Sequence, residues 1–548
     1  MTDTRTGGEW VVEALRAEGV RHVFGIPGVH NLAIYDALFR QDAKAAMGGQ
    51  GPIVHVLARH EAGAAFMADG YARSSGRVGV VVVTTGPGAT NVLTPLAESY
   101  AGSQPIVVVA SDVASADVGR EVGALHEVTN QIECFRPVTR FAEVVRRAED
   151  IPATIRRAFA RVRTSRPGPA AISIPNDLLA ARAGALVGDA GTTGRPACDA
   201  GELAEAARLL RGATRPLVVA GGGVVAAAAE RELLALARRL GAPVITTVMG
   251  RGAVPEDDPL WLGVLPNGRA TGPVLERADV VLAVGCRFAH RSTQGLLLNL
   301  RFTPEQTLIH LDLDPAVLGK LFEPRLGIVG DARDGLGRLV GLLGAGPPAG
   351  GWDDAWLAGQ RTAASARYTP EIAGFMTTLR RALPPEAIVV NDQTGINYWM
   401  EWRFPVSRSR TFLYPVGSAV LGYAVPAAIG AQIAHPGTPV IAVVGDGGFM
   451  FSVAELATAV KYRLPVVFLV VNDDRYGAIK WLQEAIYGKW GEADLANPDF
   501  PALARAFGAH GERLASLDAL PKALAAAFRA DGPTVLELRM TVDPPWDL

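Results

Sequence analysis

The sequence predicts an α/β protein built from three domains with mainly parallel sheets. Short apolar runs of strand length alternate with segments of helical periodicity along the chain, a pattern typical of strands joined by crossover helices. The chain has 548 residues, more than one hydrophobic core usually holds. Two stretches rich in Pro and Gly, 184–196 and 344–351, indicate linkers. We therefore predict domains at residues 1–185, 197–343 and 352–548.

The first two domains show the alternation in order. The expected elements of the first domain are helices at 8–18, 31–39 and 61–74 and strands at 22–25, 79–84 and 106–110. The expected strands of the second domain are 216–220, 243–247, 279–284 and 307–311, with helices between them. This order predicts a doubly wound sheet. The turn of three glycines at 221–223 is a weak signal for dinucleotide binding, because such turns more often serve strand–helix packing.

The third domain contains the most informative stretch of the chain, residues 439–476. An apolar run at 440–444 predicts a strand, an acidic glycine-rich turn follows it, 449–460 has helical spacing, and 465–471 predicts the next buried strand. Both strands end in polar residues. Because the carboxyl ends of parallel strands meet at one edge of a sheet, where ligands of open α/β sheets bind, we expect the two polar turns to form one site.

The residue types in these turns suit a metal ion beside a phosphate group. Asp446 in the first turn and Asn472 at the end of the second strand are 26 positions apart, yet they can lie side by side. A carboxylate, an amide oxygen and a nearby backbone carbonyl are hard ligands suited to Mg²⁺. Glycines let backbone N–H groups approach a phosphate at a helix start. The glycines of this turn are Gly445, Gly447 and Gly448.

Composition and charge argue against several function classes. With a formal net charge of −2, the chain has no basic footprint for nucleic acid and no polybasic patch for a membrane. Cys134, Cys198 and Cys286 lack metal-ligand spacing, so we expect reduced thiols in a cytoplasmic protein. The start of the chain lacks the apolar region of a signal peptide. The apolar stretch 416–434 contains Pro426 and several glycines, so we expect a buried loop and helix there and no membrane span.

The pattern Gly-Asp-Gly followed by Asn resembles the diphosphate-binding motif of thiamine diphosphate (ThDP) enzymes. The resemblance implies that Asp446 and Asn472 bind Mg²⁺ through their side chains and that Asp474 binds it through its carbonyl. The further cofactor contacts implied here are those of Thr394, Gly445, Gly447, Gly448 and Tyr476. A lone motif of this kind is often an ordinary strand–helix–strand unit with an acidic turn. Here other parts of the family pattern occur, in order, over nearly the whole chain.

The segment 59–73, RHEAGAAFMADGYAR, resembles the helix that carries the catalytic glutamate of this family. Taken alone, Glu61 is a carboxylate that stabilises the start of a helix. The resemblance implies that Glu61 shares a proton with the aminopyrimidine ring of the cofactor and so activates the thiazolium carbon.

Three further matches complete the expected cofactor site. The segment 84–91, TTGPGATN, resembles the turn that approaches the cofactor ring, and it implies contacts from Gly86 and Asn91. The segment 416–431 resembles the part of the family that bends the cofactor. It places Leu421 as a wedge between the two rings and the carbonyl of Ala419 as a hydrogen-bond acceptor. Finally, Pro27 and Gly28 follow the first strand as they do in the family.

Within the family, the chain resembles the acetolactate synthase large subunit and 2-ketoarginine (5-guanidino-2-oxopentanoate) decarboxylase. It departs from the synthase where substrate is expected. Val29 and His30 follow Gly28 where the synthase has another glycine, His126 replaces a glutamine, and Leu421 replaces a methionine. Histidines titrate near neutrality and suit protonation of an enamine, although either could be a hydrogen-bonded structural histidine. The loop 265–272 lacks the segment that helps hold flavin, so the sequence does not support FAD binding.

These features predict a ThDP- and Mg²⁺-dependent lyase that decarboxylates a 2-oxo acid through an enamine and releases an aldehyde, with Glu61, His30, His126 and Leu421 as catalytic residues. The first alternative is acetolactate synthase-type carboligation with pyruvate as donor. The second is a silent regulatory paralogue, against which the intact Glu61 and Asp446 argue.

The resemblance also implies partners and a substrate-access region. Family members pair two subunits, so we expect at least a dimer and, further, a homotetramer, with Glu61 of one chain facing Asp446 of the other. Gln483, Glu484 and Tyr487 fall where the substrate-access helix of the family lies, and Glu484 could meet a cationic substrate tail.

Overall fold

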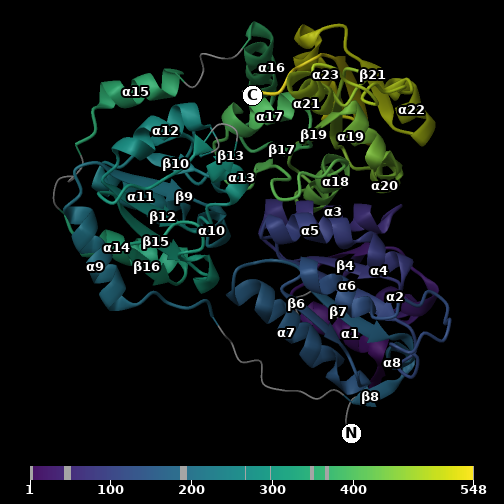
Figure 1. Cartoon of the computed structure of the whole chain (residues 1–548). Helices are drawn as coiled ribbons and strands as arrows, with labels where there is room; N and C mark the ends of the chain where they lie inside the picture. The colour runs from purple at the N-terminus through teal and green to yellow at the C-terminus, as the bar shows by residue number, and fades with distance from the viewer. Residues whose placement is uncertain are drawn as a thin grey trace.

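The computed structural model describes residues 4–41, 51–184, 194–265, 267–295, 298–345, 351–363 and 369–546. They form three α/β domains, seen as three lobes in Figure 1, as the sequence predicts. Each domain is built on a six-stranded sheet in which all neighbouring strands are parallel. The predicted linkers fall largely on residues 185–193 and 346–350, outside the described residues.

The first domain has the strand order β3-β2-β4-β5-β7-β6. The strands of this sheet are β2 (His22–Gly25), β3 (Val54–Leu57), β4 (Gly79–Val83), β5 (Ile106–Asp112), β6 (Phe141–Val144) and β7 (Ala170–Pro175), and β1 (Thr4–Thr6) pairs separately with β8 (Arg182–Gly184). Its helices include α1 (Gly7–Ala17), α2 (Leu32–Phe39), α3 (Glu61–Ser75), α4 (Pro87–Asn91), α5 (Leu93–Ala101), α6 (Gln131–Phe135), α7 (Ile151–Thr164) and α8 (Asn176–Ala180). The central strands are buried at every position, which is why they read as continuous apolar runs.

The second domain has the order β11-β10-β9-β12-β15-β16, a doubly wound sheet as expected. The strands of this sheet are β9 (Pro216–Ala220), β10 (Val244–Thr246), β11 (Trp261–Val264), β12 (Val280–Val284), β15 (Thr307–Asp312) and β16 (Leu326–Val329), and β13 (Gln294–Gly295) pairs separately with β14 (Leu298–Asn299). Its helices include α9 (Ala200–Arg211), α10 (Gly222–Ala226), α11 (Glu230–Leu240), α12 (Gly268–Arg277) and α14 (Ala332–Leu343).

The third domain has the order β18-β17-β19-β20-β22-β21. Its strands are β17 (Ile388–Asn391), β18 (Phe412–Leu413), β19 (Val440–Gly445), β20 (Val467–Asn472), β21 (His510–Arg513) and β22 (Thr534–Arg539). Its helices include α16 (Pro370–Ala382), α17 (Gly395–Arg403), α18 (Ala424–Ala434), α19 (Asp446–Phe451), α20 (Leu456–Lys461), α21 (Gly477–Tyr487), α22 (Phe500–Phe507) and α23 (Leu520–Ala527).

One hydrophobic core joins the first and third domains across the helices α3 and α18, which lie side by side in Figure 1. Their backbones touch. A Cβ atom on Gly70 would lie 2.0 Å from the carbonyl oxygen of Ala427, and one on Gly430 would lie 1.9 Å from that of Met67. Glycine is therefore required at both crossing points. The helix that begins with Glu61 is thus fixed against the third domain of its own chain.

The helix predicted over 449–460 is the one element that the structure breaks. Helix α19 ends at Phe451, a 3₁₀ turn occupies Val453–Glu455, and α20 begins at Leu456. Ser452 has a non-helical backbone (φ −134°, ψ 20°). The break brings the Glu455 carboxylate to the first domain, where it accepts hydrogen bonds from the backbone N–H groups of Arg59 and His60. This tertiary contact overrides the local helical pattern.

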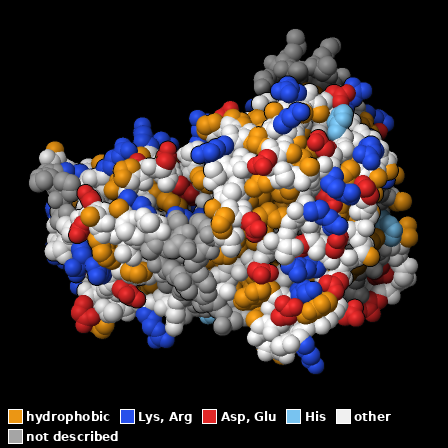
Figure 2. All heavy atoms as spheres, turned by 90° about the horizontal axis from the view of Figure 1, so that it is seen from above, with side chains coloured by type: hydrophobic (Ala, Val, Ile, Leu, Met, Phe, Trp, Pro, Cys, Tyr) orange, Lys and Arg blue, Asp and Glu red, His pale blue; other side chains and the backbone are white. Residues whose placement is uncertain are grey.

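The surface shows charges of both signs. On the face seen in Figure 2, Lys and Arg side chains are interspersed with Asp and Glu, and apolar side chains gather near the middle. Within the described part of the chain, no helix has the length and apolar character that a membrane crossing needs. The expected buried loop and helix at 416–434 is a partly exposed loop followed by the buried helix α18.

Candidate functional site

The carboxyl edge of the third sheet brings together the three predicted metal ligands. Strands β19 and β20 pair in parallel with Gly445 opposite Val471, so Asp446, directly after β19, lies level with Asn472, the last residue of β20. The side-chain amide of Asn497 lies between Asp446, Asn472 and Asp474. Its Nδ2 lies 2.7 Å from Asp446 Oδ2, 3.4 Å from Asn472 Oδ1 and 3.1 Å from Asp474 Oδ1. Three side-chain oxygen atoms thus surround one small volume. The Asp474 carbonyl, which is the predicted ligand atom, instead accepts a hydrogen bond from the N–H of Leu495 (2.7 Å).

Neighbouring groups set the direction of the Asn472 side chain. Its Nδ2 donates to Glu537 Oε1 (2.8 Å), and the other oxygen of Glu537 accepts from Arg513 (2.8 Å). Because the amide nitrogen is held away from the centre, Oδ1 faces it. Asp474 has a positive φ of 55°, and its N–H donates to the same Asn472 Oδ1.

The chemistry of this donor set fits a hard divalent cation. Asp446 is buried, and burial raises the pKa of its carboxyl to about 6, so a positive charge there would favour the ionised form. The described residues contain no cluster of three or more His, Cys, Asp and Glu side chains placed to hold a metal. The donors here are instead carboxylate and amide oxygens, types that Mg²⁺ accepts.

Each glycine of the acidic turn has a packing reason as well. A Cβ on Gly445 would lie 2.9 Å from Thr394 Oγ1, and one on Gly447 would lie 2.6 Å from the ring of Tyr476. A Cβ on Gly448 would lie 2.9 Å from Asp392 Oδ1. Thr394 and Tyr476, both predicted to contact the cofactor, therefore lie directly against the turn.

Asp392 is a site residue that the sequence analysis missed. It follows β17, is fully buried, and accepts hydrogen bonds from the N–H groups of Gly422 (3.3 Å) and Ala424 (2.9 Å). Burial raises its pKa to about 6. Asp392 thus ties the start of α18 to the edge of the sheet. A polar residue directly after a buried strand, in NDQTG, was the available signal.

The predicted catalytic glutamate lies at the first residue of α3. Glu61 Oε2 accepts a hydrogen bond from Asn91 Nδ2 (2.9 Å), so two predicted site residues meet. Two groups fix the helix start: His60 Nδ1 accepts from the N–H of Ala62 (3.1 Å), and Glu455 binds the two N–H groups before the helix. The position of Glu61 therefore depends on a carboxylate from the third domain, which the sequence analysis did not identify.

The turn after β4 is held equally firmly. Gly86 has a positive φ of 67°, and a Cβ there would lie 2.3 Å from the carbonyl oxygen of His126. Its N–H donates to Gln131 Oε1 (2.7 Å), and the Gln131 amide in turn donates to the carbonyl of Ser111 and the hydroxyl of Ser173. Only glycine fits this turn, and Gln131 is the residue that holds it.

The two predicted histidines face each other across the end of the first sheet. The ring centroids of His30 and His126 are 5.4 Å apart. Burial, and next the neighbouring His126, lower the pKa of His30, while Asp112 opposes the shift. The turn before His30 is fixed by Asn31, whose Oδ1 accepts from the N–H of Gly28 (2.7 Å); this turn includes Pro27. The pair is therefore a preformed feature.

The remaining predicted residues lie on more exposed elements. Ala419 and Leu421 occupy the loop before α18, and Ala419 has a positive φ of 51°. Gln483, Glu484 and Tyr487 lie on α21, where Glu484 and Tyr487 are exposed. Among the described residues, no hydrogen bond or ion pair joins Glu61 to Asp446, Asn472 or Asp474. One chain therefore presents two sheet edges, each with part of the predicted site.

A cavity of about 550 Å³ lies elsewhere, where residues of all three domains meet. Arginines line it, among them Arg166 and Arg287. Burial lowers the pKa of Arg166 to about 10, and its Nη2 has no hydrogen-bond partner among the described residues. The glycine turn at 221–223 also reaches this cavity. A Cβ on Gly223 would lie only 2.5 Å from the Cα of Gly285, so the turn packs tightly on Gly285. This agrees with a packing role for the turn.

Comparison with known proteins defines the class. Three models of thiamine pyrophosphate enzymes match, thiamine pyrophosphate being another name for ThDP: the N-terminal TPP binding domain over residues 5–134, the central domain over 203–339, and the C-terminal TPP binding domain over 392–538. The chain belongs to the thiamine pyrophosphate enzyme family.

The relatives at the level of whole proteins include two kinds of enzyme. The chain is 34% identical to the probable acetolactate synthase large subunit of Methanocaldococcus jannaschii, over 98% of this chain and 92% of that protein. It is 33% identical to the acetolactate synthase isozyme 2 large subunit of Escherichia coli, over 97% and 95%. It is 38% identical to the probable 2-ketoarginine decarboxylase AruI of Pseudomonas aeruginosa, over 98% and 94%. The predicted resemblance to both groups is confirmed.

Proposed function

We propose that this chain is a ThDP- and Mg²⁺-dependent decarboxylase of a 2-oxo acid that releases an aldehyde. The observation that carries the proposal is the facing pair His30 and His126, with ring centroids 5.4 Å apart. The pair lies at the sheet edge that also holds Gly86, whose Cβ position touches the backbone of His126. A protonated imidazole can donate its proton to the carbon from which CO₂ has left.

The cofactor contacts proposed here follow the two sheet edges. Asp446 and Asn472 would hold Mg²⁺ with their converging oxygen atoms, and the carbonyl of Asp474 would complete the set of protein ligands. Glu61, with its carboxylate hydrogen-bonded to Asn91, would exchange a proton with the aminopyrimidine ring. When bound, ThDP supplies the electron sink that decarboxylation of a 2-oxo acid needs.

The complete site is proposed to form between two copies of the chain. Exposed apolar side chains flank both sheet edges: Val29 and Leu125 beside the histidines are 64% and 60% exposed, and Phe451 at the end of α19 is 63% exposed. Contiguous exposed apolar patches mark contact surfaces, and these side chains would contribute to such a patch at each edge. We therefore propose a dimer as the minimum unit, with Glu61 of one chain opposite Asp446 of the other, and a homotetramer as its further assembly.

Two more features complete the proposal. The three cysteines are unpaired, and burial raises the pKa of both Cys198 and Cys286 to about 12; thiols kept neutral and buried fit the cytoplasm. Strand β11 ends at Val264 and α12 begins at Gly268, which leaves no room for the flavin-holding segment. Protein purified without added flavin should therefore show no flavin absorbance band.

Carboligation with pyruvate as donor is the second candidate, because two of the named relatives are acetolactate synthases. Against it, the sheet edge that holds Gly86 presents His126 where the synthase pattern has glutamine. The name of one relative, the 2-ketoarginine decarboxylase, suggests 5-guanidino-2-oxopentanoate as a substrate, and the exposed Glu484 on α21 offers a carboxylate to a cationic tail.

The test is product analysis. Purified enzyme with ThDP and Mg²⁺ would be given pyruvate, longer aliphatic 2-oxo acids and 5-guanidino-2-oxopentanoate in parallel, and CO₂, aldehyde and acetolactate would be measured. We expect one equivalent of aldehyde for each CO₂ with the best substrate. Pyruvate as best substrate with acetolactate as main product would contradict the proposal and favour the synthase.

A further inference from the structure

The loop that precedes α18 holds a strained residue at an exposed position. We call residues 414–423 the wedge loop. Gly417, Ser418 and Ala419 at its middle are exposed, yet Ala419 has a φ of 51°. A residue with a Cβ is uncommon in this left-handed region and costs free energy there. An exposed loop would relax unless groups outside it held the backbone.

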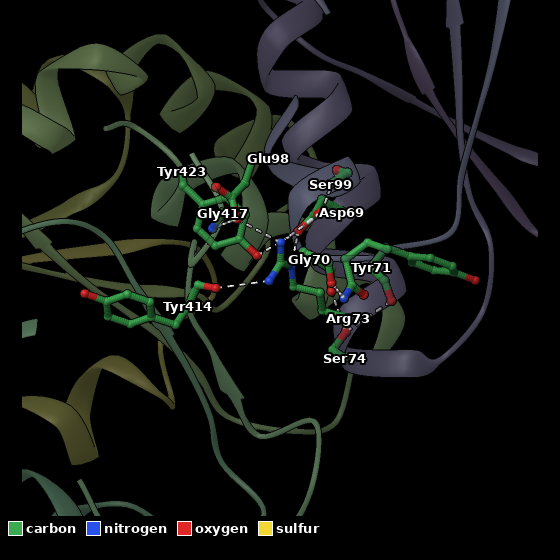
Figure 3. A network of polar contacts seen from close by, with 12 residues as sticks. Asp69, Gly70, Tyr71, Arg73, Ser74, Glu98, Ser99, Tyr414, Gly417 and Tyr423 are labelled. Atoms are coloured by element: carbon green, nitrogen blue, oxygen red, sulfur yellow. Dashed lines mark hydrogen bonds and ion pairs between the residues drawn. The ribbon is translucent and has the colours of Figure 1, made fainter. Parts of the chain in front are cut away.

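One buried carboxylate supplies that hold. Glu98, on α5 of the first domain, is fully buried and accepts hydrogen bonds from two successive N–H groups of the loop: Gly417 N to Oε1 at 3.1 Å and Ser418 N to Oε2 at 2.7 Å. Figure 3 shows the Glu98 side chain reaching toward Gly417. The loop also lies close against α5, because a Cβ on Gly417 would be 2.1 Å from the Cβ of Ala101.

The ends of the wedge loop are anchored separately. Arg73 Nη1 donates to the carbonyl of Tyr414 (3.0 Å), and Asp392 accepts from the N–H groups of Gly422 and Ala424. The hydroxyl of Tyr423 donates to Asp69 Oδ1 (2.9 Å). Both ends of the loop are thus fixed. Between them, the two hydrogen bonds that Glu98 accepts hold the backbone of Gly417 and Ser418, immediately before Ala419.

Glu98 belongs to a buried charge network that joins α5 to α3, the helix that begins with Glu61. Arg73 Nη2 lies 3.3 Å from Glu98 Oε1, Arg73 Nε bonds to Asp69, and Ser99 Oγ donates to Asp69 Oδ2 (2.7 Å), as Figure 3 shows. Burial alone would lower the pKa of Arg73, but Asp69 and Glu98 raise it. Two carboxylates share one guanidinium here, so the backbone donors of the loop are needed to satisfy Glu98. Buried ion pairs contribute little net stability, which favours a positional role.

We propose that Glu98 is a positioning residue that holds Ala419 in its left-handed conformation and so aims the Ala419 carbonyl and the Leu421 side chain at the cofactor. The inference rests on the proposed function, in which these two groups contact ThDP. It also gives the first domain a second role, because this domain would present Glu61 and at the same time shape the cofactor pocket of the third domain in the same chain.

The test is a double-mutant cycle with Glu98→Gln and Ala419→Gly in the full-length protein. Glu98→Gln keeps the shape but sets an NH₂ group against a loop N–H. We expect it to slow exchange of the thiazolium proton, followed by NMR, and to weaken ThDP binding in calorimetry with Mg²⁺, each on the order of tenfold, the worth of one charged hydrogen bond. Glycine adopts positive φ readily. Glu98→Gln should therefore reduce the rate of proton exchange and the affinity for ThDP clearly less in the Ala419→Gly background than in the wild type. If Glu98→Gln only damaged the fold, its effects on proton exchange and ThDP binding would be the same in the wild-type and Ala419→Gly backgrounds.

Ser99→Ala is the matched control. Ser99 lies beside Glu98 and is buried in the same network, but its hydroxyl bonds only to Asp69 among the described residues and does not touch the loop. Ser99→Ala should lower the Tm through its lost hydrogen bond while leaving proton exchange near the wild-type rate. If Glu98→Gln does not fold, Glu98→Asp replaces it, because the shorter carboxylate stays near Arg73 but no longer reaches Ser418 N. Slowed exchange in that variant is the result we expect.

The outcomes separate the two claims. Wild-type protein that binds ThDP and exchanges its proton, together with Glu98 variants that behave like Ser99→Ala, would overturn the positioning role and leave the proposed function intact. Equal effects of Glu98→Gln in both backgrounds would overturn it too. Wild-type protein that fails to bind ThDP would instead contradict the proposed function itself.

Discussion

Glu61→Gln is the substitution that separates cofactor activation from cofactor binding. Glutamine has the shape of glutamate, and its carbonyl oxygen can still accept the 2.9 Å hydrogen bond from Asn91. The helix start is held by Glu455 and His60, which the change does not touch. What disappears is the group that can exchange a proton with the aminopyrimidine ring.

The magnitude follows from that loss. Positioned acid–base catalysis contributes roughly 10²–10⁴-fold, so turnover should fall by that factor, about 2.7–5.4 kcal/mol of activation free energy. Asn91→Ala removes only the supporting hydrogen bond. A hydrogen bond to a charged group is worth about 1.5–3 kcal/mol, so this variant should lose roughly tenfold to a hundredfold at most.

The assay follows the thiazolium proton of bound ThDP by NMR after dilution into D₂O, beside calorimetric binding of ThDP with Mg²⁺ and steady-state turnover. We expect Glu61→Gln to bind ThDP nearly as the wild type does but to exchange the proton slowly. Exchange at the wild-type rate in this variant would show that Glu61 is not the activating group, and the role carried over from the family would have to be withdrawn.

Three further predictions concern the metal, the histidine pair and the domain contact. Asp446→Ala removes a buried ligand carboxylate, so calorimetry should show ThDP binding lost or greatly weakened while the circular dichroism spectrum is kept; unchanged affinity would refute the metal site. His126→Gln should slow aldehyde release more than loss of CO₂ from the substrate, and equal slowing of both would argue against a proton donor. Burial raises the pKa of the Glu455 carboxyl above its ordinary 4.5, so the folded protein keeps the carboxyl proton to higher pH than the unfolded chain does. The stability that this proton contributes is present below the unfolded pKa and is lost as pH rises through the raised pKa. The Tm of the wild type should therefore fall more than that of Glu455→Gln between pH 4.5 and pH 8; parallel curves would contradict this interpretation.

Much of the third domain follows from the sequence because parallel strand pairing is a strong constraint. Two apolar runs with polar ends predicted that Asp446 and Asn472 would follow adjacent strands, and the register of β19 and β20 confirms it. The strands β2 and β9 also begin and end where their apolar runs do. Continuous burial leaves little freedom in placing such elements.

The parts that could not be predicted depend on contacts between distant segments. Glu98 bonds to Ser418, 320 positions away, and Glu455 bonds to His60, 395 positions away. Neither glutamate differs by its local pattern from an ordinary helix residue. Asn497 lies in an irregular segment between α21 and α22, where no periodicity indicates its direction. The break at Ser452 follows from the same cause, because a tertiary hydrogen bond outweighs a helical pattern.

The product ratio of the wild-type enzyme tests the central claim most directly. With ThDP, Mg²⁺ and the best 2-oxo acid of a panel that includes pyruvate and 5-guanidino-2-oxopentanoate, aldehyde and CO₂ should form in equal amounts, with little ligated product. If pyruvate is the best substrate and acetolactate accounts for most of the CO₂ released, the histidine pair does not direct the reaction to an aldehyde, and the protein is a synthase.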